Sequence, residues 1–308
     1  MTSQSVGAQP REGRVFDLGY RHYEGPREGR NAARFAVYID GLRTSLGIGR
    51  GGRAKVLPWL FIAISVTVAL VLALIAGTAE RLGGAGTAES LDLPSHSDYY
   101  GIASIILFIF AAIAAPELLC PDRRSGAISL YLVRPLSGSD YVLARWASFL
   151  TIMFLVAWLP QVVLFAGLAL GDPEPGDYLA DNWLDVPRFL AAGAAIGIYT
   201  TSLAMAVAGF TTRRAYAAAF LIGLFVISTP VTTGLAESIG GTTGQWISLF
   251  NLTNVPLHLN DLVFDSTSDL LNNSPSLELP RVVRVGLFFV LASIAGILMW
   301  NKYRRMSV

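Results

Sequence analysis

The chain has 308 residues, of which 53% are hydrophobic and 15% are charged. A soluble domain of this size carries about 25% charged residues, so the chain lacks the polar surface of a water-facing globule. Its net charge of +1 points to neither an acidic partner nor nucleic acid, and its single cysteine, Cys120, excludes an intrachain disulfide.

Residues 1–56 are expected to form a cytoplasmic N-terminal segment. Within 32–46, apolar residues recur at spacings of four, three and four, as Phe35, Ile39, Leu42 and Leu46. This spacing predicts one apolar face on a helix. The helix is expected to lie in the inner membrane interface, to pack on a partner protein, or both. Several glycines between 47 and 52 then predict a flexible elbow.

Six apolar runs are long enough to cross a bilayer, which takes about 20 residues. They are 57–77, 99–119, 146–170, 188–210, 215–236 and 282–300. We therefore predict an all-α, polytopic membrane protein whose transmembrane domain covers 57–300 and whose tail covers 301–308. Because the first run begins near Leu57, no cleavable signal peptide is expected.

Basic residues give these helices an orientation. Nineteen of the 23 lysine and arginine residues fall in the N-terminal segment, the 121–145 loop, the 211–214 turn and the tail. With six helices these four segments share one side of the membrane. The positive-inside rule assigns that side, and hence both termini, to the cytoplasm. The protein is expected in the cytoplasmic membrane.

The segment before the last run, 237–281, is partly apolar. Between 245 and 264 the apolar residues are interrupted by Pro256 and three asparagines. This stretch is too broken to span the bilayer. We expect short re-entrant helices that are shielded by protein or line a wet cavity.

The sequence carries no recognisable catalytic or metal motif. No Gly-x-x-x-x-Gly-Lys-Ser/Thr loop is present, so hydrolysis of ATP by that route is excluded. His22, His96 and His258 lack metal-ligand spacing. Five of the six helices have no ionisable residue in their central turns, which argues against an ion-coupled carrier. We expect no cofactor in this chain and an energy source outside it.

The predicted helix interiors are mildly polar. Gly193 and Gly197 form a Gly-x-x-x-Gly pair, Tyr199 and Thr200 follow it, and Gln161 lies next to a proline. Small residues at this interval let helices approach closely. Two interpretations stay open for the group, namely helix packing and a subunit interface or substrate path.

The most informative stretch is the loop 115–145. Glu117 lies at the inner membrane edge, and Arg123 and Arg124 follow at a turn where a contact with that carboxylate is feasible. A short apolar helix is expected to begin at Gly126, to include Ile128, Leu130, Tyr131 and Leu132, and to end at Pro135. Ser137 or Ser139 is expected to cap the next helix. A short amphipathic helix of this kind suits docking into a groove of a partner.

This loop resembles the type-2 ABC-transporter permease family. Members show a glutamate, then arginine and glycine, then a leucine-rich segment, and then proline and serine before a helix with a basic residue. The matching positions here are Glu117, Arg123 or Arg124, Gly126, Leu130 with Leu132, Pro135, Ser139 and Arg145. Residues 19–30 also look like a segment of bacterial members. The Ala-Ile-Ser run at 127–129 departs from the commoner Thr-Leu-Glu.

The resemblance implies two permeases, identical or sibling, above two separate ATPase subunits that bind ATP and magnesium. It implies that the ATPases dock on the loop and on the 34–46 segment, with the 211–214 turn as a second candidate. The implied docking residues are Arg34, Arg43, Glu117, Arg123, Arg124, Gly126, Ile128, Leu132 and Pro135.

We therefore expect an ATP-driven export permease without its own enzymatic activity. An uncharged, mildly polar interior favours an amphipathic or apolar substrate such as a drug or a lipid. The main alternative is a membrane sensor or immunity component that works beside an ATPase. A membrane-embedded enzyme and an ion-coupled carrier are further alternatives, which the missing catalytic and intramembrane ionisable residues disfavour.

Overall fold

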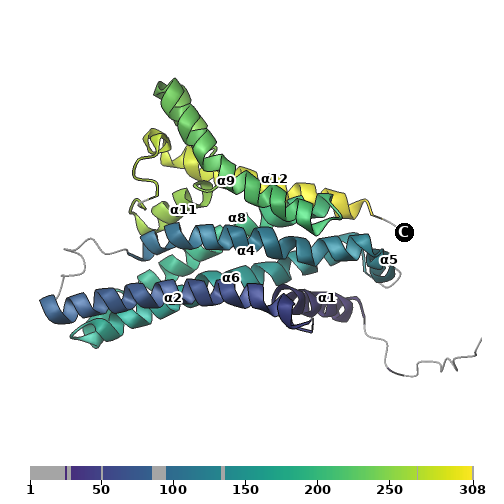
Figure 1. Ribbon diagram of the computed structural model, residues 1–308, viewed down its shortest axis with the longest axis horizontal. Helices are drawn as coiled ribbons and strands as arrows, with labels where there is room; N and C mark the ends of the chain where they lie inside the picture. Colours follow the sequence, from purple (N-terminus) through teal and green to yellow (C-terminus); the bar gives the residue numbers. More distant parts are fainter. Residues whose placement is uncertain are drawn as a thin grey trace, which may run out of the picture.

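The computed structural model describes residues 25, 29–49, 51–84, 95–132, 136–268 and 270–306. These residues form eleven α-helices and one 3-10 helix, with no strand among them (Figure 1). In chain order the elements are α1 (Arg30–Ser45), α2 (Gly52–Gly83), α4 (His96–Arg124), α5 (Ala127–Leu132), α6 (Gly138–Gly171), α7 (Pro175–Asp181), α8 (Asp185–Phe210), α9 (Arg214–Ile239), α10 (Gly241–Leu249), α11 (Val255–Phe264), η1 (Pro275–Glu278) and α12 (Arg281–Arg304).

Six of the described helices are long and apolar enough to cross a membrane, namely α2, α4, α6, α8, α9 and α12. The prediction of an all-α, multi-pass membrane protein is confirmed. Each helix extends beyond the predicted run, and the largest shift of a single end is in α6, which begins at residue 138 rather than 146. Ser137 and Asp140 form a capping box there. Ser95 and Asp98 form another at the start of α4, which likewise begins earlier than predicted.

The centre of the bundle is α4 and α8, whose most apolar stretches are each 67% buried inside the chain. On one flank α2 lies against α6 at very short range. A Cβ atom added to Gly171 would lie 2.4 Å from the Cα atom of Gly77, and one added to Gly167 would lie 2.5 Å from the Cβ of Ala73. Only glycine permits this approach of two backbones. On the other flank α9 runs obliquely away from the bundle (Figure 1), and only 11% of its most apolar stretch is buried.

Helix α1 lies along α6, at the same end of the bundle as α5 (Figure 1). We call this end the α1/α5 end. The residues that α1 buries most fully are Val37, Gly41 and Ser45, whereas Leu42 and Leu46 of the predicted stripe are partly buried against the core. Phe35, the first residue of the stripe, is 63% exposed. The close crossing decides the orientation, since a Cβ at Gly41 would lie 2.1 Å from Oγ of Ser148 in α6.

At the opposite end, α10, α11 and η1 form the predicted group of short helices before the last span. Helix α11 buries Val255 and Leu257 completely and packs against α8 and α12. The Nδ2 atom of Asn260 donates a hydrogen bond to Oγ of Ser97 at the start of α4 (3.0 Å). The polar residues that interrupt this segment are therefore turned into the protein.

Candidate partner-docking site

Helices α1 and α5 line a groove of about 470 Å³ at the α1/α5 end. We call it the α1/α5 groove. Its walls are mostly small or apolar, and its lining residues are Ala33, Ala36, Val37, Asp40, Ala127, Leu130, Tyr131 and Leu136. The structure thus brings together the two segments that the sequence assigned separately to partner docking. A concave apolar surface with one carboxylate is a binding surface for a protruding side chain or helix edge.

The short helix α5 has two different faces. Ile128 and Tyr131 pack against the hydrophobic core of the bundle, whereas Leu130 is 72% exposed and lines the groove. Residues three apart share a face of a helix, so Ile128 and Tyr131 turn together toward the bundle, and Tyr131 also borders the groove. Gly126, with a φ of +71°, makes the turn from α4 into α5.

Helix α1 is fastened to α6 by charged groups. The carboxylate of Asp140 accepts hydrogen bonds from Nε of Arg30 (2.7 Å) and from Nη2 of Arg34 (2.6 Å). Asp140 is itself nearly buried and caps the start of α6 together with Ser137. Tyr38 and Thr151 share a further hydrogen bond of 2.9 Å between the two helices. One wall of the groove is therefore attached firmly to a transmembrane helix.

Arg145 of α6 connects three helices. Its side chain is 2% exposed, and its Nη2 atom donates to Oδ2 of Asp122 in α4 (2.8 Å). Its Nη1 atom lies 2.8 Å from Oδ2 of Asp40 in α1, an ion pair without an aligned hydrogen bond. The Tyr141 hydroxyl also donates to Asp122 (2.6 Å). Because Asp40 also lines the groove, a charge brought into the groove acts on a group that contacts Arg145.

Aromatic rings extend the connection from α5 toward α12. The ring centroids of Tyr131 and Tyr141 are 5.5 Å apart, and those of Tyr141 and Tyr303 are 5.9 Å apart. Distances in this range are those of favourable aromatic pairs. Burial raises the pKa of the Tyr131 hydroxyl, so this residue stays neutral at physiological pH. The groove is thus in contact with α6 directly and with α12 through one intervening ring.

The turn between α8 and α9 is held by the end of α4. The Arg123 guanidinium donates to the carbonyl oxygens of Gly209 and Thr211, which end α8 and carry the negative end of its dipole. Glu117 pairs with Nη1 of Arg214 at 2.6–2.7 Å. The sequence had suggested Arg123 or Arg124 as the partner of Glu117, and the structure shows Arg214 instead.

The predicted docking residues fall into different surroundings. The guanidinium of Arg34 is engaged by Asp140, and Ile128 faces the bundle rather than the groove. Arg43 and Arg124 are exposed at the α1/α5 end. Pro135, with residues 133 and 134 and most of the 19–30 segment, lies outside the described residues. The groove residues Ala36 and Leu130 lie within the predicted docking segments but were not among the named docking residues, and the alternation of faces within α5 is the signal that identifies Leu130.

The second predicted group is buried within the single chain. A Cβ at Gly193 would lie 2.5 Å from the Tyr100 hydroxyl, and one at Gly197 would lie 3.0 Å from the Phe154 ring. Tyr199 stacks on Phe288 of α12, and the Thr200 hydroxyl donates to the carbonyl of Ile196 in its own helix (2.6 Å). Gln161 pairs with His96, as Nε2 donates to the His96 carbonyl (3.0 Å) and Oε1 contacts Nδ1 (2.6 Å). These contacts are those of helix packing.

Histidine, cysteine and carboxylate side chains do not gather into a metal site anywhere in the part of the chain that the structure describes. Comparison of the sequence with protein-family models and with curated proteins gave no match. The function proposed below therefore rests on the geometry of the α1/α5 groove and on the six membrane spans.

Proposed function

We propose that the chain is the permease subunit of an ATP-driven ABC exporter and that a separate ATPase subunit docks in the α1/α5 groove. The observation that carries this proposal is the groove itself. It is concave and apolar, it lies at the end of the bundle with the excess of basic residues, and its two walls are connected to the transmembrane helices. A surface that is both accessible and mechanically connected suits the transmission of force.

In this proposal the partner moves α5, and two sets of contacts transmit the motion to the transmembrane helices. One is the series of rings from Tyr131 to Tyr303, and the other is the ion pair between Asp40 and Arg145. ATP and magnesium are bound by the partner. A second permease copy, identical or sibling, is proposed to pack against α9, whose apolar surface is largely uncovered. The buried, uncharged polar groups of α8 favour an amphipathic or apolar cargo over an ion.

Affinity purification of the tagged full-length chain from its native membranes tests the proposal. We expect an ATPase subunit to co-purify with the wild type and to be lost from Leu130→Asp, because this change puts a charge into the groove without disturbing the core. Leu82→Asp is the matched control, since Leu82 is exposed at the opposite end of α2. Recovery of the chain without any ATPase, or equal losses in both variants, would contradict the proposal.

A sensor or immunity component beside an ATPase would use the same groove. The distinguishing measurement is transport in proteoliposomes of the complex against a panel of lipids and drugs. An exporter is expected to move at least one of them with ATP. A complex that hydrolyses ATP but moves none of the panel favours the sensor.

A further inference from the structure

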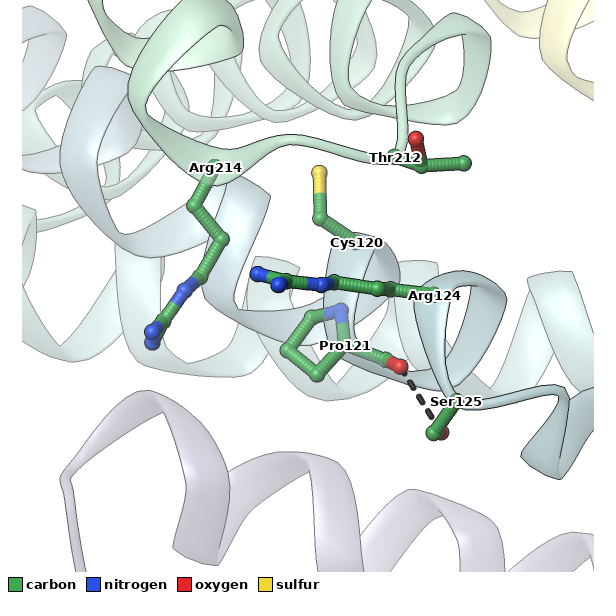
Figure 2. Close-up of a pocket in the computed structure, with 6 residues that line it drawn as sticks. All are labelled: Cys120, Pro121, Arg124, Ser125, Thr212 and Arg214. Carbon is green, nitrogen blue, oxygen red and sulfur yellow. Dashed lines mark hydrogen bonds between the residues drawn. The ribbon is translucent and has the colours of Figure 1, made fainter.

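A second cavity, of about 500 Å³, lies at the ends of α4 and α9. Figure 2 shows its lining residues, which are Cys120, Pro121, Arg124, Ser125, Thr212 and Arg214. Its rim holds two guanidinium groups, and the neighbouring carboxylate, Glu117, is paired with Arg214. We call this cavity the basic pocket. It is separate from the α1/α5 groove and shares no lining residue with it.

The position of the basic pocket relative to the membrane follows from the two helices whose ends form it. Arg124 is the last residue of α4, and Arg214 is the first residue of α9. The 29 residues of α4 rise about 43 Å, which matches the roughly 40–45 Å of a bilayer with its headgroup layers. Both guanidinium groups therefore lie at headgroup depth.

One of the two charges of the basic pocket, that of Arg124, has no counter-charge in the described part of the chain. Arg124 is exposed and makes no ion pair or hydrogen bond to the described part of the chain. Figure 2 shows its side chain extended across the pocket toward the side on which Arg214 lies. The preceding residue, Arg123, already donates hydrogen bonds to the carbonyl oxygens of Gly209 and Thr211. An anion that enters the pocket therefore meets the guanidinium of Arg124, which has no partner among the described residues, and that of Arg214, which is paired with Glu117.

From these observations we infer that the basic pocket binds the phosphate of an anionic phospholipid headgroup. Arginine binds phosphate oxygens through paired, charge-assisted hydrogen bonds, and basic pockets between transmembrane helices recognise anionic headgroups. The first two turns of α9, which begins at the pocket with Arg214, expose Tyr216 and Phe220 on the outer side of that helix. These rings supply an apolar surface for the acyl chains, which a soluble phosphate compound would leave unused.

The site rests on the membrane spans and not on the ATPase proposal, so either inference can fail while the other stands. The test titrates delipidated, full-length protein with phosphatidylglycerol or with phosphatidylcholine of the same acyl chains, and native mass spectrometry counts the bound lipids. We expect one phosphatidylglycerol to bind at least about tenfold more tightly than phosphatidylcholine. Equal affinity for the two lipids would overturn the assignment.

Substitutions at Arg124 test whether the lipid binds in the basic pocket. Arg124→Gln is expected to lower the affinity for phosphatidylglycerol about tenfold, and Arg124→Lys is expected to fall in between, because lysine keeps the charge without the paired geometry. Arg304→Gln is the matched control, an exposed arginine at the end of α12 on the same side of the membrane, and it is expected to bind as the wild type does. Equal losses in the glutamine variants would overturn the site.

Two further measurements distinguish a bound lipid from other occupants of the basic pocket. Glycerol phosphate carries the headgroup chemistry without acyl chains, and it is expected not to displace the lipid at equal concentration. Displacement would assign the pocket to a soluble phosphate compound and overturn the inference. Arg124→Gln is also assayed for co-purification of an ATPase subunit. Its loss, with lipid affinity retained, would assign the pocket to protein docking instead.

Discussion

The Nη1 atom of Arg145 in α6 lies 2.8 Å from the Oδ2 atom of Asp40 in α1. One partner is buried and the other is 55% exposed and lines the α1/α5 groove. A buried cation thus reaches the α1/α5 groove through a single contact. Its second partner is Asp122, in the last turn of α4. The groove and the end of α4 are therefore both connected to the guanidinium group of Arg145.

The first prediction concerns this guanidinium. Arg145→Gln leaves the largely buried carboxylate of Asp122 without its cation, and removal of one partner from a buried pair costs about 3–5 kcal/mol. We expect a clear fall in the melting temperature of the detergent-solubilised protein, measured by intrinsic tryptophan fluorescence. Asp122→Asn should lower it more than Asp40→Asn, because Asp40 is the more exposed of the two carboxylates.

Arg281→Gln is the control for that prediction. Arg281 pairs with Asp265 at 3.1 Å, and both side chains are more than 60% exposed. Pairs of this kind contribute about 0–1 kcal/mol, so the melting temperature should hardly change. If Arg145→Gln and Arg281→Gln melt alike, Arg145 does not hold the three helices together.

The second prediction concerns the crossing of α1 and α6. Gly41→Ala places a methyl group where Oγ of Ser148 lies, and backbone or side chain must move to admit it. Overpacking of this kind costs about 1–3 kcal/mol. We expect a lower melting temperature and, since α1 forms one wall of the groove, weaker retention of any groove partner.

Gly223→Ala in α9 is the matched control, because a Cβ at Gly223 meets nothing within 4 Å. It should melt at or above the wild-type temperature, since alanine is the better helix former. The double variant Gly41→Ala with Ser148→Gly is expected to recover the loss. A failure to recover would mean that the strain at Gly41 does not arise at Ser148.

The third prediction concerns pH at the end of the bundle opposite α1 and α5. Burial raises the pKa of Asp261 from 3.8 to about 6, although a backbone hydrogen bond from Ser268 opposes the shift. The folded chain therefore holds this proton to a higher pH than the unfolded chain does. The resulting stabilisation is complete below about pH 4 and is lost as the pH rises through about 6.

At pH 7.5 an ionised Asp261 thus destabilises the fold, and Asp261→Asn is expected to raise the melting temperature. The gain corresponds to at most about 3 kcal/mol and should vanish below pH 4. Burial lowers the pKa of the neighbouring His258 to about 4, so acid destabilises both proteins there. Asp265→Asn, an exposed control on the same loop, should not be stabilised. A gain in Asp261→Asn that persists at pH 3.5 would contradict this account.

Much of the fold follows from local rules that a single sequence displays. Hydropathy finds all six spans because a bilayer demands about 20 apolar residues in each. Ser137 or Ser139 was expected to cap the next helix with Asp140 in its first turn, and the structure has the cap at Ser137. Gly126 and the apolar residues after it predict α5 for the same reason. These features need no knowledge of what lies across the bundle.

The contacts between helices do not follow from such rules. Glu117 was expected to meet an arginine a few positions away, yet Arg123 is drawn to the carbonyls that end α8, and Arg214 takes its place. Phe35, at the start of the apolar stripe of α1, is exposed, and the closest approach to α6 falls instead on Gly41, a residue without a side chain. Partner choice of this kind depends on how helices cross, which periodicity within one helix does not encode.

The last prediction decides between packing and a substrate path for the buried polar groups. Gln161→Leu removes both bonds to His96 and leaves the buried Nδ1 atom of His96 without its partner, which costs about 1–3 kcal/mol. We expect a lower melting temperature, measured without any substrate. Thr200→Val keeps the volume of a side chain whose hydroxyl bonds only its own helix, so it should melt within a degree or two of the wild type. If Gln161→Leu instead keeps its stability and changes transport by the complex, Gln161 faces the cargo and the packing interpretation is wrong.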